Sequence, residues 1–198
     1  MESQLITPET REKLLATATT ALRESEKALL QSIELRRRSK MDVSHKDYAI
    51  WNAYEFILLV QFDVSCLMRD MVSHESELGP NLYARLLVLT IYESTLTMRR
   101  LLSRNFQSTL ENALEIENNS ALRQIHSRVQ RLFEECNLQM GAVRDGIVGH
   151  RDADADVRVE LLEKADVQEV TDLTIELLQT LGAILPYFFL YFAKHYAR

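Results

Sequence analysis

The sequence has few of the residues that interrupt regular structure or cross-link a small protein. Its 198 residues include 5 glycines, 3 prolines and 2 cysteines. Because glycine and proline break helices and strands, their scarcity favours long, uninterrupted elements. The cysteines, Cys66 and Cys136, both lie inside apolar runs and are too few for a disulfide framework. We therefore expect free thiols and a reducing, cytoplasmic environment.

Targeting and membrane signals are missing as well. The first residues, MESQLITPET, lack a basic stretch followed by an apolar core, so no secretion signal is expected. The longest apolar run, Leu181–Ala193, contains Pro186 and is too short to span a bilayer. No segment alternates convincingly as a strand does, and no internal repeat stands out. These absences predict a single soluble all-α domain over residues 1–198, with no membrane partner.

An excess of basic residues is the third absence. The formal net charge is −6, which argues mildly against a nucleic-acid partner. The acids are concentrated late in the chain: from Asp152 onward, 9 acids and 4 bases give −5, and the other 20 acids and 19 bases give −1. A local basic patch before Asp152 is therefore compatible with the sequence.

What is present is a strong helical pattern. Apolar residues at helical spacing indicate five main helices in a mostly up-and-down bundle. The first begins with Thr7 as its N-cap and Pro8 at its first helical position. The others are expected at Tyr48–His74, Leu82–Arg104, Ala121–Val148 and Val167–Ala193. The second is apolar nearly all round, as is typical of a central buried helix. Residues 106–120 indicate a short helix and a loop.

One stretch near the end of the fourth predicted helix, AVRDGIVGHRDADAD, combines residues suited to chemistry. It contains Arg144, Asp145 and His150, with Gly146 and Gly149 among them. In an unbroken helix, six residues separate two positions by about 120° around the axis and ~9 Å along it. Arg144 and His150 would then lie on different faces. They converge if the helix breaks at a glycine, or if a second copy meets the first across a two-fold axis.

This stretch resembles the signature of the HEPN superfamily: an arginine, a polar residue directly after it, a short spacer and a histidine. Arg144, Asp145 and His150 fit that signature, and the form R-D-x-x-x-x-H-R-D is especially similar to bacterial abortive-infection-type HEPN proteins. Beyond the motif the resemblance is architectural: an all-helical chain with the motif late and one long helix after it. It implies a homodimer whose two motifs meet in one cleft. For many members it implies a metal-independent endoribonuclease acting as a toxin or phage-defence effector.

The residue types suit RNA cleavage without a metal or other cofactor. The ribose 2′-hydroxyl attacks the adjacent phosphate and leaves a 2′,3′-cyclic phosphate. His150 is the expected proton-transfer group, because histidine titrates near neutral pH. Arg144 is expected to bind the phosphate as negative charge builds up in the transition state. Asp145 is expected to orient one of them or to cap a backbone N–H. RNA and an antitoxin protein are the partners implied.

Two other interpretations stay open. Some HEPN proteins do not cleave and only bind RNA, a nucleotide or a partner protein, and the acidic balance fits such a module. In the third interpretation the chain is a plain helical scaffold, in which Arg144 and His150 merely suit the negative end of a helix dipole.

Three weaker signals complete the candidates. Residues 152–163 place acids as an EF-hand loop does, but Val157 stands where that loop needs glycine, which favours a solvated acidic loop. The stretch LRRRSK, residues 35–40, is either a phosphate-binding patch or a solvated helix end. The range Tyr48–His74 and the aromatic end near Phe188 and Phe189 are predicted to contribute to the dimer interface, which should bury more than about 1,000 Å².

Overall fold

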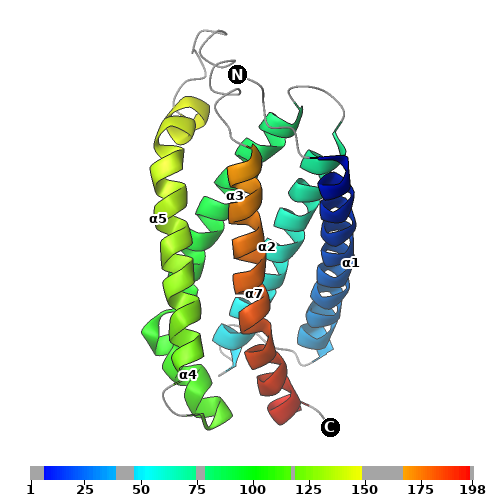
Figure 1. The fold of residues 1–198 in the computed structure, drawn as a ribbon. Coiled ribbons are helices and arrows are strands. Elements are labelled where there is room, and N and C mark those ends of the chain that lie inside the picture. Colours follow the sequence, from blue (N-terminus) through cyan, green and yellow to red (C-terminus); the bar gives the residue numbers. More distant parts are fainter. Residues whose placement is uncertain (1–6, 39–46, 75–78, 117–118, 149–166, 197–198) are drawn as a thin grey trace.

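The computed structural model describes residues 7–38, 47–74, 79–116, 119–148 and 167–196, and of residues 139–148 it describes the backbone. Over these ranges the chain forms six α-helices and no strand (Figure 1). They are α1 (Pro8–Arg38), α2 (Tyr48–Ser73), α3 (Gly79–Leu101), α4 (Arg104–Leu114), α5 (Ser120–Val148) and α7 (Val167–Tyr196). The predicted all-α helical bundle is confirmed. Six helices are described: the five main helices expected and α4, which corresponds to the short helix indicated over residues 106–120.

The start of α1 follows the prediction. The backbone N–H of Thr10 donates to Oγ1 of Thr7 at 3.3 Å, and Pro8 is the first helical residue. A side-chain oxygen at this position accepts from a donor that the first turn leaves unpaired. Thr7 is therefore the N-cap that the sequence predicted.

The predicted helix Leu82–Arg104 is wrong at its C-terminal end. Helix α3 ends at Leu101, Ser103 has an extended ψ of 163°, and Arg104 is the first residue of α4. The change of direction lets Phe106 and Leu110 of α4 enter the core, where both are buried. Local helix propensity cannot foresee this, because the burial of a second amphipathic helix decides it.

Helix α2 occupies the centre of the bundle and packs against α1, α3, α4 and α7. Among the largest fully buried side chains are four from α2: Trp51, Ile57, Leu58 and Met71. The predicted central buried helix is confirmed. The expectation that this apolar helix also contributes to a dimer interface stays a prediction, and Leu59 of α2 is 45% exposed.

Helix α7 packs against α2, α3, α4 and α5. Phe188 is 0% exposed, and its ring lies 5.4 Å from that of Tyr54, so this side chain belongs to the core of the bundle. Phe189 and Leu190 remain 52% and 59% exposed. By length and composition α7 is apolar enough to cross a membrane, although 39% of its most apolar window is buried within the bundle. The absence of a membrane partner stays a prediction.

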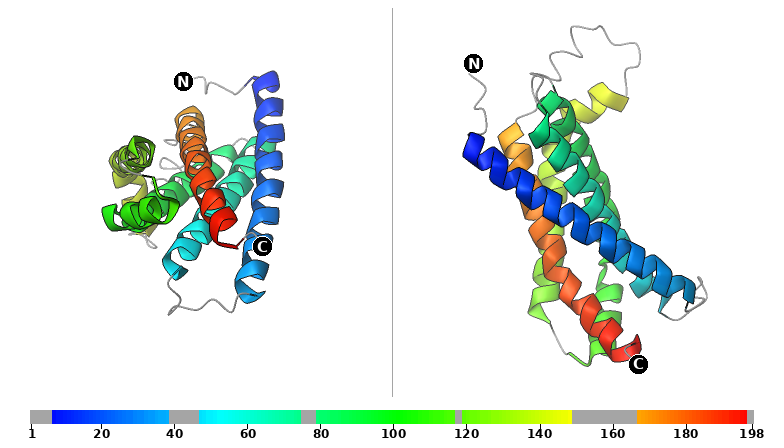
Figure 2. Two further views of the ribbon diagram at one scale, coloured as in Figure 1. Left: turned by 90° about the horizontal axis from the view of Figure 1, so that it is seen from below. Right: turned by 90° about the vertical axis from the view of Figure 1, so that its right-hand side faces the viewer.

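Helix α1 lies on one side of the bundle and packs chiefly against α2, to which it is antiparallel (Figure 2). An ion pair joins them near one end, with Arg36 Nη1 3.0 Å from Glu55 Oε2. Near the other end, Arg11 Nε donates to the carbonyl oxygen of Val72 at 2.6 Å. Polar contacts at both ends therefore fix the register of this pair.

Candidate functional site

The candidate motif lies at the C-terminal end of α5. The backbone of Arg144 and Asp145 is helical, and the helix continues through Val148. Gly146 is inside α5, so the helix break that the sequence permits at this glycine does not occur. His150 lies outside the described residues, as does Gly149. The described backbone thus places two members of the motif in the last turns of one helix.

This end of α5 lies at the end of the bundle where α1, α3 and α7 begin and α2 ends (Figure 1). Helices α5 and α7 are antiparallel, and Arg131 of α5 forms an ion pair with Glu176 of α7. Counting from that pair, α5 runs about two turns beyond the first residue of α7, as Figure 1 also shows. The helical backbone that carries Arg144 and Asp145 therefore projects past α7.

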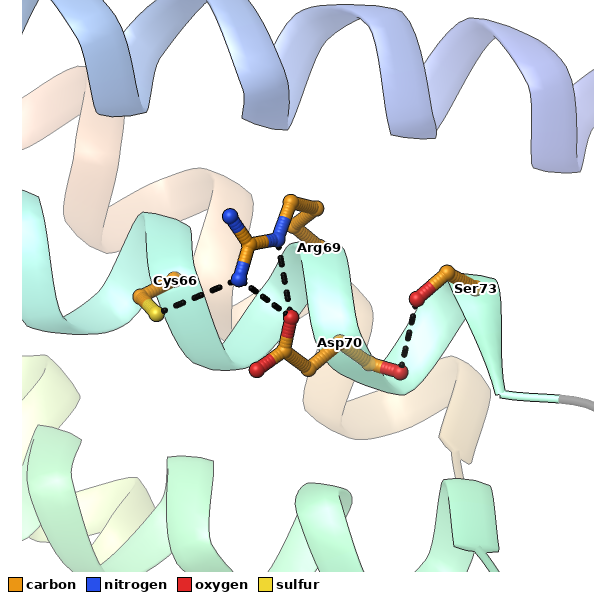
Figure 3. A network of polar contacts seen from close by, with 4 residues as sticks. All are labelled: Cys66, Arg69, Asp70 and Ser73. Carbon is orange, nitrogen blue, oxygen red and sulfur yellow. Dashed lines mark hydrogen bonds and ion pairs between the residues drawn. The ribbon is translucent and has the colours of Figure 1, made fainter.

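A polar network on α2 lies at the same end of the bundle (Figure 3). Arg69 donates from Nε and Nη2 to Oδ1 of Asp70, at 2.8 and 2.6 Å, and from Nη2 to Sγ of Cys66 at 3.6 Å. The hydrogen bonds to Asp70 raise the pKa of Arg69 above its usual value. Because Asp70 already neutralises this guanidinium, the network offers no free cation to the motif.

Arg85 of α3 differs from Arg69. Its Nε is buried and has no hydrogen-bond partner among the described residues. Burial also lowers its pKa below the usual value. A buried donor without an acceptor is costly, so Nε of Arg85 lacks the hydrogen bond that such groups normally make.

An aromatic and cationic seam joins α3 to α5. The rings of Tyr92 and Phe133 stack with their centroids 5.4 Å apart and an interplanar angle of 24°. The guanidinium of Arg99 lies 4.2 Å from the centroid of the Phe133 ring. No carboxylate in the described part of the chain pairs with Arg99. The seam therefore positions a cation by an aromatic contact alone.

A shallow groove of about 370 Å³ runs between α5 and α7. Its lining consists of Arg128, Arg131, Asp172, Ile175, Glu176 and Gln179. Two cations face two anions there, and Arg131 is already paired with Glu176. The groove is thus close to neutral and favours neither an anionic nor a cationic ligand.

The weaker sequence candidates have different outcomes. The acidic stretch 152–163 lies outside the described residues, and within the described ranges no three or more His, Cys, Asp or Glu gather as a metal site. In LRRRSK, Arg36 binds Glu55 at 3.0 Å and Arg38 binds Glu34 at 2.8 Å. Two of its three arginines are therefore neutralised, which weakens the phosphate-binding interpretation.

The sequence prediction missed the seam. A signal was present, because Arg85, Tyr92 and Arg99 are spaced by seven residues and so share one face of a helix. What the sequence could not reveal is that Phe133 of α5 lies against that face.

Comparisons with known proteins add no identity. No protein-family model, no curated protein and no solved structure matches this chain.

Proposed function

We propose that this protein is an HEPN-like, metal-independent endoribonuclease, acting as a toxin or phage-defence effector in the cytoplasm. The observation that supports the proposal most is the R-D-x-x-x-x-H pattern of Arg144, Asp145 and His150 at the end of a long helix in an all-α bundle. One further long helix, α7, follows it. An antitoxin protein is a proposed partner.

In the proposed reaction, the 2′-hydroxyl of the RNA attacks the adjacent phosphorus and the bond to the 5′-oxygen of the next nucleotide breaks. His150 transfers the proton, since an imidazole serves as base or acid near neutral pH. Arg144 binds the phosphate oxygens through its planar pair of donors. Asp145 orients one of these groups. The products are a 2′,3′-cyclic phosphate and a 5′-hydroxyl end.

The continuous end of α5 gives a reason for a second copy of the chain. Helix α5 continues without a break at Gly146 as far as Val148. The break that would let Arg144 and His150 of one chain converge is therefore absent at this glycine. A two-fold axis close to this projecting end brings two copies of Arg144 and His150 into one cleft, as an isologous interface does. We therefore propose that the active form is a homodimer assembled at this end.

The test is purified full-length protein with structured RNA in excess EDTA. We expect the wild type to cleave and His150→Ala to lose at least about a hundredfold in rate, because general acid–base catalysis contributes that much. His126→Ala is the matched control, since His126 also lies on α5 but outside the motif. Equal cleavage by wild type and His150→Ala, or no cleavage by either at high enzyme concentration, refutes the catalytic claim.

The net charge of −6 favours a second candidate, a non-catalytic HEPN-like module that binds RNA, a nucleotide or a partner protein. Binding without cleavage in the same experiment, with affinity lost in Arg144→Ala, supports this module over the enzyme.

A further inference from the structure

One segment of the described chain carries an excess of positive charge. Residues 79–110, which form α3 and most of α4, contain four arginines (Arg85, Arg99, Arg100 and Arg104) and one acid, Glu93, a net of +3. The whole chain has a net charge of −6. None of these four arginines forms an ion pair with a described residue. This segment is a locally basic stretch whose arginines, unlike Arg36 and Arg38, have no described acidic partner.

One of the four arginines, Arg99, is held in place without an acidic partner. The ring of Phe133 covers one face of the Arg99 guanidinium at 4.2 Å. Tyr92 stacks on the same ring and so fixes its position. A cation–π contact leaves the N–H donors at the edge of the guanidinium plane available, and an anion is what these donors bind best. Arg99 is therefore a positioned cation whose hydrogen-bonding capacity the described protein does not use.

Arg85 continues the row toward the motif. It precedes Tyr92 by seven residues, as Tyr92 precedes Arg99, so the three share one face and span ~21 Å along α3. Helices α3 and α5 are antiparallel, and Phe133 lies opposite Tyr92. Seven residues toward the N-terminus of α3 thus correspond to seven toward the C-terminus of α5, which places Arg85 about level with residue 140. The row leads from Phe133 toward the end of α5 that carries Arg144.

The two helices separate in that direction. Figure 1 shows α3 behind α5 at the lower part of the bundle and well apart from it at the upper end, where α5 terminates. Arg99 lies where the helices are in contact, and Arg85 lies nearer to where they diverge. Arg85, whose buried Nε has no partner among the described residues, therefore lies nearer than Arg99 to the end of the bundle that carries the motif.

We propose that the row Arg85–Tyr92–Arg99, with Arg100 beside it, binds the phosphate backbone of single-stranded RNA and leads the strand to the motif. This assignment rests on the proposed function for its choice of RNA among polyanions. An unpaired strand bends so that phosphates several nucleotides apart reach the two arginines, and its bases are free to contact the half-exposed Tyr92. The row acts by positioning the substrate, and cleavage belongs to the motif.

The experiment measures binding apart from cleavage. The probe is a fluorescein-labelled, unpaired 2′-O-methyl oligoribonucleotide, which lacks the attacking hydroxyl, titrated with the full chain in EDTA at several salt concentrations. We expect Arg99→Gln and Arg85→Gln each to weaken binding about tenfold and to lower the salt slope by about 0.7, the contribution of one phosphate contact on a single strand. On cleavable RNA the same variants should raise KM and leave kcat unchanged.

Controls keep the result interpretable. Arg37→Gln removes an exposed arginine of α1 that pairs with no described acid, and it should bind like the wild type. Arg99→Lys keeps the charge and should recover part of the affinity lost in Arg99→Gln. Circular dichroism and thermal unfolding show whether each variant is folded, and Arg100→Gln, whose side chain is exposed, provides a second test of the row.

The outcomes separate this inference from the proposed function. Wild-type affinity in Arg85→Gln, Arg99→Gln and Arg100→Gln overturns the proposal that the row binds RNA, even if His150→Ala abolishes cleavage. Salt-dependent binding that the row variants weaken supports the row, even if no RNA is cleaved and the enzymatic proposal fails. Absence of RNA binding overturns the row. Equal binding of phosphatidylserine vesicles, lost in the same variants, overturns the assignment to RNA.

Discussion

The α1–α2 pair and the α3–α5 pair are both antiparallel, yet they differ in what their arginines contact. Across α1–α2, Arg36 forms an ion pair with Glu55 at 3.0 Å. Across α3–α5, Arg99 lies over the ring of Phe133, and Arg85 has no described acceptor for its Nε. An arginine paired with a carboxylate joins two helices, whereas one without an acceptor retains its capacity to bind an external anion. The difference separates structural cations from cations available to a ligand.

The largest expected effect concerns the two cysteines, one in each helix pair, because they differ in burial. Cys136 of α5 is 0% exposed, and burial raises the pKa of its thiol to about 12, whereas Cys66 of α2 is partly exposed. The folded pKa of Cys136 lies above that of the unfolded chain, so its contribution to stability is fully present below about pH 9. Above pH 9 the unfolded thiol ionises and the folded thiol does not, which favours unfolding.

We therefore expect the free energy of unfolding to fall by roughly 2 to 3 kcal/mol between pH 9 and pH 11 through Cys136 alone. Urea unfolding at a series of pH values should show a steeper decline in the wild type than in Cys136→Ala, in which Tyr54 and Tyr191, whose pKa values burial also raises, still contribute. At pH 7, a thiol reagent should modify Cys66 in the folded protein and Cys136 only after unfolding. Rapid modification of Cys136 in the folded state would contradict its place in the core.

Removing the carboxylate that joins α1 to α2 should give the next largest effect. Glu55 accepts from Arg36 and from the hydroxyl of Ser32, at 3.0 and 3.1 Å, and its side chain is 13% exposed. Glu55→Ala leaves both donors without this acceptor and should lower the free energy of unfolding by about 2 kcal/mol. Chemical denaturation followed by circular dichroism measures it. RNA binding should not change. A large loss of RNA affinity would contradict the assignment of the α1–α2 ion pair to a structural role only.

Phe133→Leu tests the other pair. The leucine keeps apolar volume but removes the ring that stacks on Tyr92 and supports Arg99. We expect a loss of about 1 kcal/mol in stability, the sum of a weak aromatic pair and a weak cation–π contact. The same variant should also bind single-stranded RNA less tightly, because Arg99 loses its fixed position. A change in stability with unaltered RNA affinity would mean that the ring has a packing role only.

The smallest effect is expected from an exposed ion pair within α1. Arg38 and Glu34 lie one helical turn apart at 2.8 Å, and their side chains are 74% and 52% exposed. Arg38→Gln should cost about 0.3 kcal/mol, as exposed pairs of this spacing do. Thermal unfolding of this variant against the wild type sets the baseline against which Glu55→Ala is judged. A cost as large as that of Glu55→Ala would show that burial does not govern these pairs.

The sequence predicted the helices well because their signals are local. The predicted range Tyr48–His74 differs from α2 by one residue, and the predicted start at Val167 is the observed start of α7. The motif was also found from sequence, and the structure adds that Arg144 and Asp145 are helical with no break at Gly146. The side-chain geometry of the motif and its dimer stay predictions.

Spacing along the chain determined which residues form helices and which face of each helix is apolar, since a period of about 3.6 residues is visible in the letters themselves. Only the tertiary structure decided which partner each side chain meets. Phe188 is buried and its neighbour Phe189 is exposed because consecutive residues of a helix point about 100° apart, so one side chain of α7 meets the core and the next does not. Likewise, Arg36 meets a carboxylate and Arg99 an aromatic ring, because the contacting residue comes from a helix distant in sequence, whose position depends on packing of the whole core.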